Sequence, residues 1–379
     1  MFIIIQKFAR SFMNHPQVTQ INKYVMLWLV ICLLMVILMV GIGGYTRLSG
    51  SGLSITEWKP VSGITPPFGE SGWLDEFSKY KNSPEFKKVN FDFTLSDFKQ
   101  IYLVEYFHRL VGRLTGFIFI IPFLFFIWRK MLKPKHIYLL STIFLLSALQ
   151  GACGWYMVKS GLASNPHVSH FRLALHLGLA LLIFSMLLWC FLSYKNSPQI
   201  SAPSSILYLS LFTTFILFTQ IMLGAFVAGL KGGLIYNSFP LMNCSLIPDE
   251  VYFHGLFNLS SPAIVQFFHR VFGFIALFLI LFLTFNIFHK KLDQRLGKRA
   301  ILLTIACIAQ IILGILTLIK IVPLELALLH QLLAFIVFSL AIYLVFPIYL
   351  ALCIKSQRKN HKELGNNLIF SIMPGNKEL

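Results

Sequence analysis

Charged residues are scarce in this chain. Only 12% of its 379 residues are Asp, Glu, Lys or Arg, whereas 57% are hydrophobic. A soluble globular protein carries about twice that charged fraction. Acids are fewest, with 14 against 32 Lys and Arg, for a formal net charge of +18. The composition excludes a soluble protein, and the lack of a basic patch interleaved with aromatics on a polar surface excludes nucleic acid as a partner.

Cysteine motifs are missing as well. The six cysteines include no Cys-x-x-Cys-His, so covalent attachment of a c-type haem is excluded. Cys244 alone falls in an expected outer loop, and without a partner there we expect no intramolecular disulfide. The other five lie in apolar segments, where they are most simply small packing residues: Cys32, Cys153, Cys190, Cys307 and Cys353.

Long apolar runs dominate instead. Eight segments are long enough to span a bilayer. Because the backbone must satisfy its own hydrogen bonds within lipid, these segments are predicted to be helices. They are Tyr24–Thr46, Tyr106–Trp128, His136–Val158, Leu173–Tyr194, Asn196–Leu230, Val271–His289, Ala300–Ile319 and Leu326–Ile354.

Basic residues are distributed unevenly between these runs. With the N-terminus inside, the inner segments hold 18 of the 32 basic residues but only three acids, Asp293, Glu363 and Glu378. Because short cytoplasmic segments are enriched in Lys and Arg, we expect both termini in the cytoplasm. The N-terminal MFIIIQKFARSFMNHP has no cleavage-site pattern. This favours a bacterial plasma membrane over the mitochondrial inner membrane.

Four motifs occur twice in the same order. Since four helices per half give both halves one orientation, we predict an all-α membrane protein made of two parallel-repeat four-helix bundles, residues 1–195 and 196–379. The matches are Glu105-Tyr-Phe-His108-Arg109 with Gln266-Phe-Phe-His269-Arg270, Gln150-x₃-Gly154 with Gln310-x₃-Gly314, LALHLGLALLIF with LALLHQLLAFIVF, and GIGGYTRLSG with LGAFVAGLKGG.

The first outer loop, residues 47–105, is much longer than the other outer loops. A loop of this length is more often functional than idle. Near its end, Thr94 to Asp97 has the spacing of a capping box, with Asp in place of the usual Glu or Gln. The spacing predicts a short amphipathic helix that runs into the second membrane helix.

Four histidines take matched places in the two halves. His108, His176, His269 and His330 lie on helices expected to run from outside to inside, all within about 8 Å of the outer helix ends. Two histidines per bundle at one depth are typical ligands of a bis-histidine haem. A polar residue hydrogen-bonded at a helix mouth would explain one such histidine more easily than four.

Arginines accompany these histidines. Arg109 and Arg270 directly follow theirs, and Arg172 precedes His176 by four positions, on the same helix face. Because a guanidinium binds both oxygens of a carboxylate, these arginines are candidate partners for haem propionates. The alternative is that each extends to the membrane interface and binds no ligand.

Glu105 distinguishes the halves. It precedes His108 by three positions, on one helix face, whereas the matching residue Gln266 cannot exchange a proton. A carboxylate beside the first haem indicates a reaction there and a supporting role for the second site. The alternative is an ion pair between Glu105 and Arg109 or Arg113 at the helix mouth.

Long motifs in the chain resemble the haem A synthase family, in its alphaproteobacterial and mitochondrial form. The likeness covers about residues 25 to 350 and is specific because the motifs are long and ordered. They are GGYTRLSGSGLSITEWKPVSGITPP, EFSKYKNSPEF, EYFHRLVGRLTG, HFRLALHLGLAL, NSFPLMN and QFFHRVFGF.

The resemblance implies eight helices in two halves and an enzyme that oxidises one methyl group of haem O to a formyl group, giving haem A for cytochrome oxidase. It implies that His108 and His176 hold haem O, that His269 and His330 ligate a haem b, and that Glu105 is the essential carboxylate. Some Gram-positive members carry a cysteine pair in the first outer loop, and this chain has none there.

The expected partners are haem O, membrane lipid and an electron donor that the sequence does not identify. Haem O synthase, cytochrome oxidase assembly factors and a second copy of the chain are further candidates. Two other functions stay open at this point. A bis-histidine b-type electron-transfer cytochrome would leave its haem unchanged, and a transporter would place its intramembrane charges near the bilayer midplane.

Overall fold

The computed structural model describes residues 23–59, 63–163, 165–195 and 200–372, with the backbone alone for His254 and 356–372. The N-terminal stretch used for the localisation prediction lies outside the described residues.

Eight helices of the described chain are long and apolar enough to cross a membrane, as predicted. Their interiors are mostly Leu, Ile, Val and Phe, and a helix pairs its backbone groups within the segment, as lipid requires. They are α2 (Lys23–Leu48), α5 (Leu95–Trp128), α6 (Pro134–Gly161), α7 (His170–Tyr194), α8 (Ser204–Gly229), α10 (Pro262–His289), α11 (Gln294–Ile319) and α12 (Leu324–Ile372, with Leu324–Lys355 as the candidate span).

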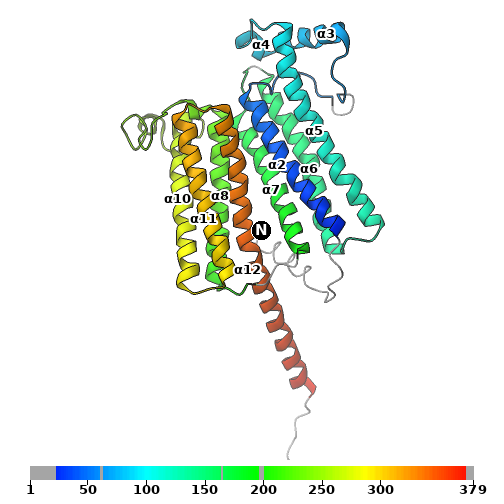
Figure 1. Cartoon of the computed structure of the whole chain (residues 1–379), viewed down its shortest axis with the longest axis vertical. Coiled ribbons are helices and arrows are strands. Elements are labelled where there is room, and N and C mark those ends of the chain that lie inside the picture. Colours follow the sequence, from blue (N-terminus) through cyan, green and yellow to red (C-terminus); the bar gives the residue numbers. More distant parts are fainter. Residues whose placement is uncertain (1–22, 60–62, 164, 196–199, 373–379) are drawn as a thin grey trace, which may run out of the picture.

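The membrane helices stand in two groups (Figure 1). In the first group α2 contacts α5 and α7, and α6 packs against α5 and α7. In the second group α8 contacts α10 and α12, and α11 packs against α10 and α12. Where the groups meet, α7 lies against α8, and α12 lies against both α2 and α7. The groups contain the helices of the predicted halves; that the halves are repeats of each other stays a prediction, as does the orientation in the membrane.

A polar contact joins the two groups. Nε2 of Gln331 on α12 donates a hydrogen bond of 2.8 Å to the carbonyl oxygen of Val40 on α2. A Cβ atom at Gly44 would lie 2.7 Å from Oε1 of Gln331, so a larger residue there would displace the Gln331 amide group. Nearby, the rings of Phe184 and Phe335 meet edge to face at 5.7 Å. The two groups therefore share one continuous apolar core.

The connections with the most structure lie at one end of the bundle, which we call the loop end. Here η1 (Gly232–Leu234) and α9 (Glu250–His254) follow α8, and α3 (Gly69–Lys81) and α4 (Pro84–Lys88) lie between α2 and α5. In Figure 1 both segments lie at the top of the view. An aromatic cluster fastens α3 to the start of α5, formed by Phe77, Tyr80, Phe98 and Tyr102 with Ile55.

The capping box before α5 is confirmed. Thr94 Oγ1 accepts the backbone N–H of Asp97 at 3.3 Å, and Oδ2 of Asp97 accepts the N–H of Thr94 at 2.9 Å. From this cap α5 runs without interruption from Leu95 to Trp128. His108 lies thirteen residues after Leu95, about 20 Å from the start of the helix, so the expectation that it lies within about 8 Å of the outer helix end is wrong. The extra turns are the amphipathic helix that the capping box predicted, and they bury their apolar side chains against α3 rather than in lipid.

Candidate functional site

The imidazoles of His269 on α10 and His330 on α12 lie next to each other near the loop end. Their ring centroids are 6.3 Å apart, and their planes cross at 79°. Two imidazoles that ligate one metal from opposite sides, through metal–nitrogen bonds of about 2.0 Å, have centroids about 6 Å apart. The spacing suits a single metal between the two rings.

His108 on α5 and His176 on α7 are the corresponding residues of the first group. They are close enough for their charges to interact. A Cβ atom at Gly154 would lie 3.0 Å from Cε1 of His176, and one at Gly43 would lie 3.5 Å from Nε2 of His108. Both rings thus rest on glycine-lined stretches of neighbouring helices, where the missing side chain leaves room for the imidazole.

These histidines fit a haem better than a bare metal ion. Among the described residues, no cluster of three or more His, Cys, Asp and Glu side chains could hold a metal. Haem iron needs only two protein ligands because the porphyrin occupies its other positions. The Nδ1 atoms of His176 and His269 are buried and have no hydrogen-bond partner among the described residues.

Glu105 is almost completely buried, with 2% of its surface exposed, and all its contacts are donors. Its Oε1 accepts from Arg109, 3.1 Å from Nε and 2.7 Å from Nη2. Its Oε2 accepts from the Ser54 hydroxyl at 2.7 Å and from the Ile55 backbone N–H at 2.8 Å. The carboxylate therefore fixes the loop that follows α2 onto α5, one turn before His108. The ion pair that the sequence left open as an alternative exists.

Gln266 occupies the matching place in the second group, but it donates hydrogen bonds where Glu105 accepts them. It is 3% exposed, and its Nε2 donates to the carbonyl oxygens of Gly232 at 3.1 Å and Ile235 at 2.8 Å. Glu105 accepts from a loop, whereas the Gln266 amide group donates to one. The two sites thus differ in charge although both residues hold a connecting segment in place.

The three arginines bind backbone carbonyls at the loop end. Arg109 donates to Ile55 at 3.0 Å and Glu57 at 3.2 Å. Arg270 donates to Tyr236 at 2.7 Å and also to Ser238, Pro240 and Leu241. Arg172 donates to Tyr156 at 2.7 Å and lies 3.7 Å from the centroid of that tyrosine ring. Their assignment as propionate partners stays a prediction, and a propionate would have to share or replace these carbonyls.

A second buried carboxylate lies in the first loop, which sequence reasoning missed. Glu85 on α4 accepts the Tyr80 hydroxyl at 3.0 Å, and that hydroxyl accepts from Nδ2 of Asn90 at 2.8 Å. Burial raises the pKa of Glu85 to about 7, and the charge of Glu105 adds to the effect. Glu85 lies within the quoted motif EFSKYKNSPEF, but only the fold shows that its carboxyl group is buried.

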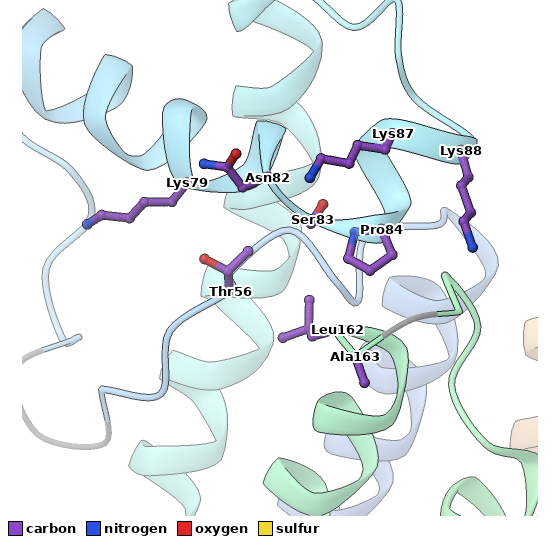
Figure 2. Close-up of a pocket in the computed structure, with 9 residues that line it drawn as sticks. All are labelled: Thr56, Lys79, Asn82, Ser83, Pro84, Lys87, Lys88, Leu162 and Ala163. Carbon is purple, nitrogen blue, oxygen red and sulfur yellow. The ribbon is translucent and has the colours of Figure 1, made fainter.

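A polar cavity of about 440 Å³ opens beside this loop (Figure 2). Figure 2 shows α3 and α4 on one side, the end of α6 on the other and the loop residue Thr56 between them. Lys79, Lys87 and Lys88 contribute positive charge, and none of the four candidate histidines lines it. The cavity is therefore separate from the histidine pairs.

The fold defines a multi-pass helical membrane protein, with two histidine pairs near the loop end as candidate haem ligands. Residues 26–342 match the COX15-CtaA family, described as "Cytochrome oxidase assembly protein". The chain is 46% identical over 326 residues to "Heme A synthase" of Wolbachia pipientis subsp. Culex pipiens, covering 85% of this chain and 96% of the relative. It is 45% identical over 327 residues to "Heme A synthase" of Rickettsia felis, covering 85% and 97%.

The chain thus belongs to the COX15-CtaA family, and haem A synthase is the enzyme function that the family and these relatives support. The family resemblance found in the sequence is confirmed. The likeness to bacterial relatives also agrees with the expected bacterial membrane, although the orientation of the termini stays a prediction.

Proposed function

We propose that haem A synthesis by this chain takes place on haem O held between His108 and His176, with a haem b held between His269 and His330. The observation that carries this assignment is the difference between the two sites. Both groups present a histidine pair near the loop end, and only the first has a carboxylate, Glu105, one turn from its histidine. A site that performs a reaction needs a protein group that acts on the substrate, whereas a site that only holds an electron carrier does not need such a group.

When bound, the haem b would supply one-electron redox chemistry close to the substrate site. His269 and His330 would hold it, since their ring centroids already lie 6.3 Å apart. The Gln331–Val40 hydrogen bond links α12, which carries His330, to α2 of the first group. This rigid connection supports the second site as a fixed neighbour of the first.

The contacts of Glu105 support an electrostatic role. Conversion of the methyl group to a formyl group replaces two C–H bonds with one C=O bond. With water as the source of oxygen, it releases four protons and four electrons, which a redox partner must accept, and positive charge develops on the carbon as the C–H bonds break. Donors surround both carboxylate oxygens, so the negative charge is held in a fixed position and needs no reorganisation during the reaction. A role in accepting protons from the substrate is the alternative, and it would require Ser54 or Arg109 to give up a hydrogen bond.

The loop of residues 54–57 has a positioning role in this proposal. Glu105 and Arg109 together bind the backbone of Ile55 and Glu57, so the loop is fastened to α5 directly beside His108. A fixed loop at this end of the bundle would keep water away from the reacting carbon and orient the macrocycle edge toward Glu105.

Extraction and chromatography of haems test the proposal. The full chain is expressed together with haem O synthase in a strain that lacks its own haem A synthase. We expect haem A in the membranes and a b-type haem in the purified protein. Recovery of unchanged haem O, with a normal low-spin spectrum, would instead identify a bis-histidine electron-transfer cytochrome.

A further inference from the structure

Three of the four candidate haem ligands are contacted by a glutamine from an adjacent helix. Gln150 on α6 donates from Nε2 to the backbone carbonyl of His176 at 3.1 Å. Gln220 on α8 donates to that of His269 at 2.9 Å, and Gln310 on α11 donates to that of His330 at 2.9 Å. Two of these amide groups also contact an imidazole nitrogen of their histidine. Gln150 is 3.3 Å from Nε2 of His176, and Gln310 is 3.2 Å from Nδ1 of His330.

Each glutamine is followed four positions later by a glycine that faces the same ring. Cβ atoms at Gly154, Gly224 and Gly314 would lie 3.0, 3.2 and 2.7 Å from Cε1 of the respective histidine. Glutamine and glycine stand on one helix face, so a Gln-x₃-Gly pair holds the histidine backbone and makes room for its ring. The spacing at Gln150 and Gln310 is evident in the sequence, and the same spacing at 220–224 was overlooked.

The fourth histidine, His108, lacks such an amide. The glycine that faces the His108 ring is Gly43, and the residue four positions before it is Met39. The Cε atom of Met39 would lie 3.5 Å from a Cβ atom at Gly112, which follows His108 by four positions. In the second group, Nε2 of Gln220 would lie 3.3 Å from a Cβ atom at Gly273, which follows His269 by four positions. Met39 therefore occupies the place of Gln220. Among the described residues, no hydrogen bond to the His108 side chain is found.

Each of the three glutamines has one polar side-chain atom without a hydrogen-bond partner in the part of the chain that the structure describes. The Oε1 atoms of Gln150, Gln220 and Gln310 are buried and have no hydrogen-bond partner among the described residues. A histidine that ligates a metal donates its other ring N–H to an acceptor, which fixes the ring and makes it a stronger ligand. Rotation of an amide by half a turn would present its oxygen to the adjacent imidazole, in exchange for the hydrogen bond from Nε2 to the histidine carbonyl.

We propose that Gln150, Gln220 and Gln310 are positioning residues that fix His176, His269 and His330 as haem ligands, and that Met39 leaves His108 as the one ligand able to release its haem. This inference rests on the proposed function. It explains how one chain could hold haem b permanently and still exchange haem O for haem A, because the second site is fixed on both sides and the first on one side only.

A reciprocal exchange tests the inference in the full-length protein, co-expressed with haem O synthase. Gln220→Met copies the first group into the second at nearly constant volume. We expect haem b to be retained roughly 10- to 100-fold more weakly, with part of its low-spin optical and EPR signal lost. Met39→Gln should slow the transfer of haem from the first site to a soluble haem-binding protein by at least about tenfold. Thr219→Val, beside Gln220, is the control, since this hydroxyl donates to Phe215 of its own helix at 3.1 Å.

Unchanged haem b retention and spectrum in Gln220→Met, or unchanged release of haem in Met39→Gln, would overturn the inference. A Gln220→Met preparation without either haem would indicate misfolding. In that case Gln310→Met, which leaves α8 intact, is tested instead, and unchanged haem b retention and spectrum in that variant would overturn the inference. The proposed function fails separately, if wild-type protein contains no b-type haem that depends on His269 and His330.

Discussion

The carboxylate of Glu105 and the guanidinium of Arg109, one turn apart on α5, form an ion pair of 2.7 Å beside the loop of residues 54–57. Only 3% of the Glu105 side chain and 16% of the Arg109 side chain are exposed. The corresponding pair in the second group, Gln266 and Arg270, is a longer contact of 3.4 Å without a negative charge. The difference supports the proposal that the reaction takes place in the first group, and it leads to the first prediction.

Glu105→Gln should abolish turnover while preserving the fold. Glutamine keeps an oxygen that can accept from Ser54 and Ile55, but it removes the charge that faces the substrate. Loss of one preorganised electrostatic group costs about 10²- to 10³-fold in rate. The variant should keep haem b and accumulate haem O or a partly oxidised haem, as measured by chromatography of extracted haems. Glu76→Gln, which removes an ion pair of the loop away from the histidines, is the control. A wild-type haem A yield from Glu105→Gln would leave the ion pair as a structural feature only.

Replacement of His269 or His330 by Ala should remove the low-spin b-type spectrum of the purified protein. Each supplies one of the two axial ligands, and their rings are already placed 6.3 Å apart for that role. His289, at the opposite end of α10, provides the matched control, because His289→Ala leaves both ligands intact. A spectrum that survives both replacements would refute the ligand assignment.

Arg→Lys at positions 109, 172 and 270 should lower haem retention. Lysine keeps the charge but cannot bind a propionate and a loop carbonyl through the planar fork of arginine, and each lost charge-assisted hydrogen bond is worth about 1.5–3 kcal/mol. Haem content per protein, with trypsin accessibility of the loops as a second readout, separates the two functions of these side chains. Loops that become accessible at full haem occupancy would show that the arginines hold only the carbonyls.

Glu85 should make the stability of the first loop depend on pH. Burial raises its pKa from an ordinary value of 4.5 to about 7, so the folded loop binds the proton more tightly than the unfolded one. The stabilisation is complete below about pH 4.5, decreases as the pH rises through about 7 and is absent above that. Glu105 reinforces the shift, whereas Lys231 opposes it.

Hydrogen exchange of the α3 and α4 amides between about pH 5 and 8, corrected for intrinsic exchange, measures this effect. Glu85→Gln should make protection independent of pH and keep an acceptor for Tyr80. Glu70→Gln, an exposed carboxyl group in the first turn of α3, should leave the pH dependence unchanged. A pH dependence that persists in Glu85→Gln would assign it to another group.

Much of the site could be predicted from the sequence because its signals are local. His108 and Glu105 share a helix face through their spacing alone, and Gln150-x₃-Gly154 and Gln310-x₃-Gly314 are visible as repeated motifs. The third such motif, at Gln220, was missed because its counterpart in the first group is Met39, so the comparison of halves did not reveal it. The arginines were expected to bind haem propionates, and their backbone carbonyl partners were not predicted. These partners are far away along the chain, about 30 positions from Arg270 and about 50 from Arg109.

The sequence by itself determined the eight membrane helices and the helix faces that carry the four histidines, because hydrophobic length and helical spacing depend on solvent and local geometry. Tertiary structure decided which donors surround Glu105 and that Glu85 is buried. Each of these depends on α3 and the loop of residues 54–57 folding back onto α5. No pattern within a single segment specifies such contacts, because the partners are brought together only when the helices and the loop pack.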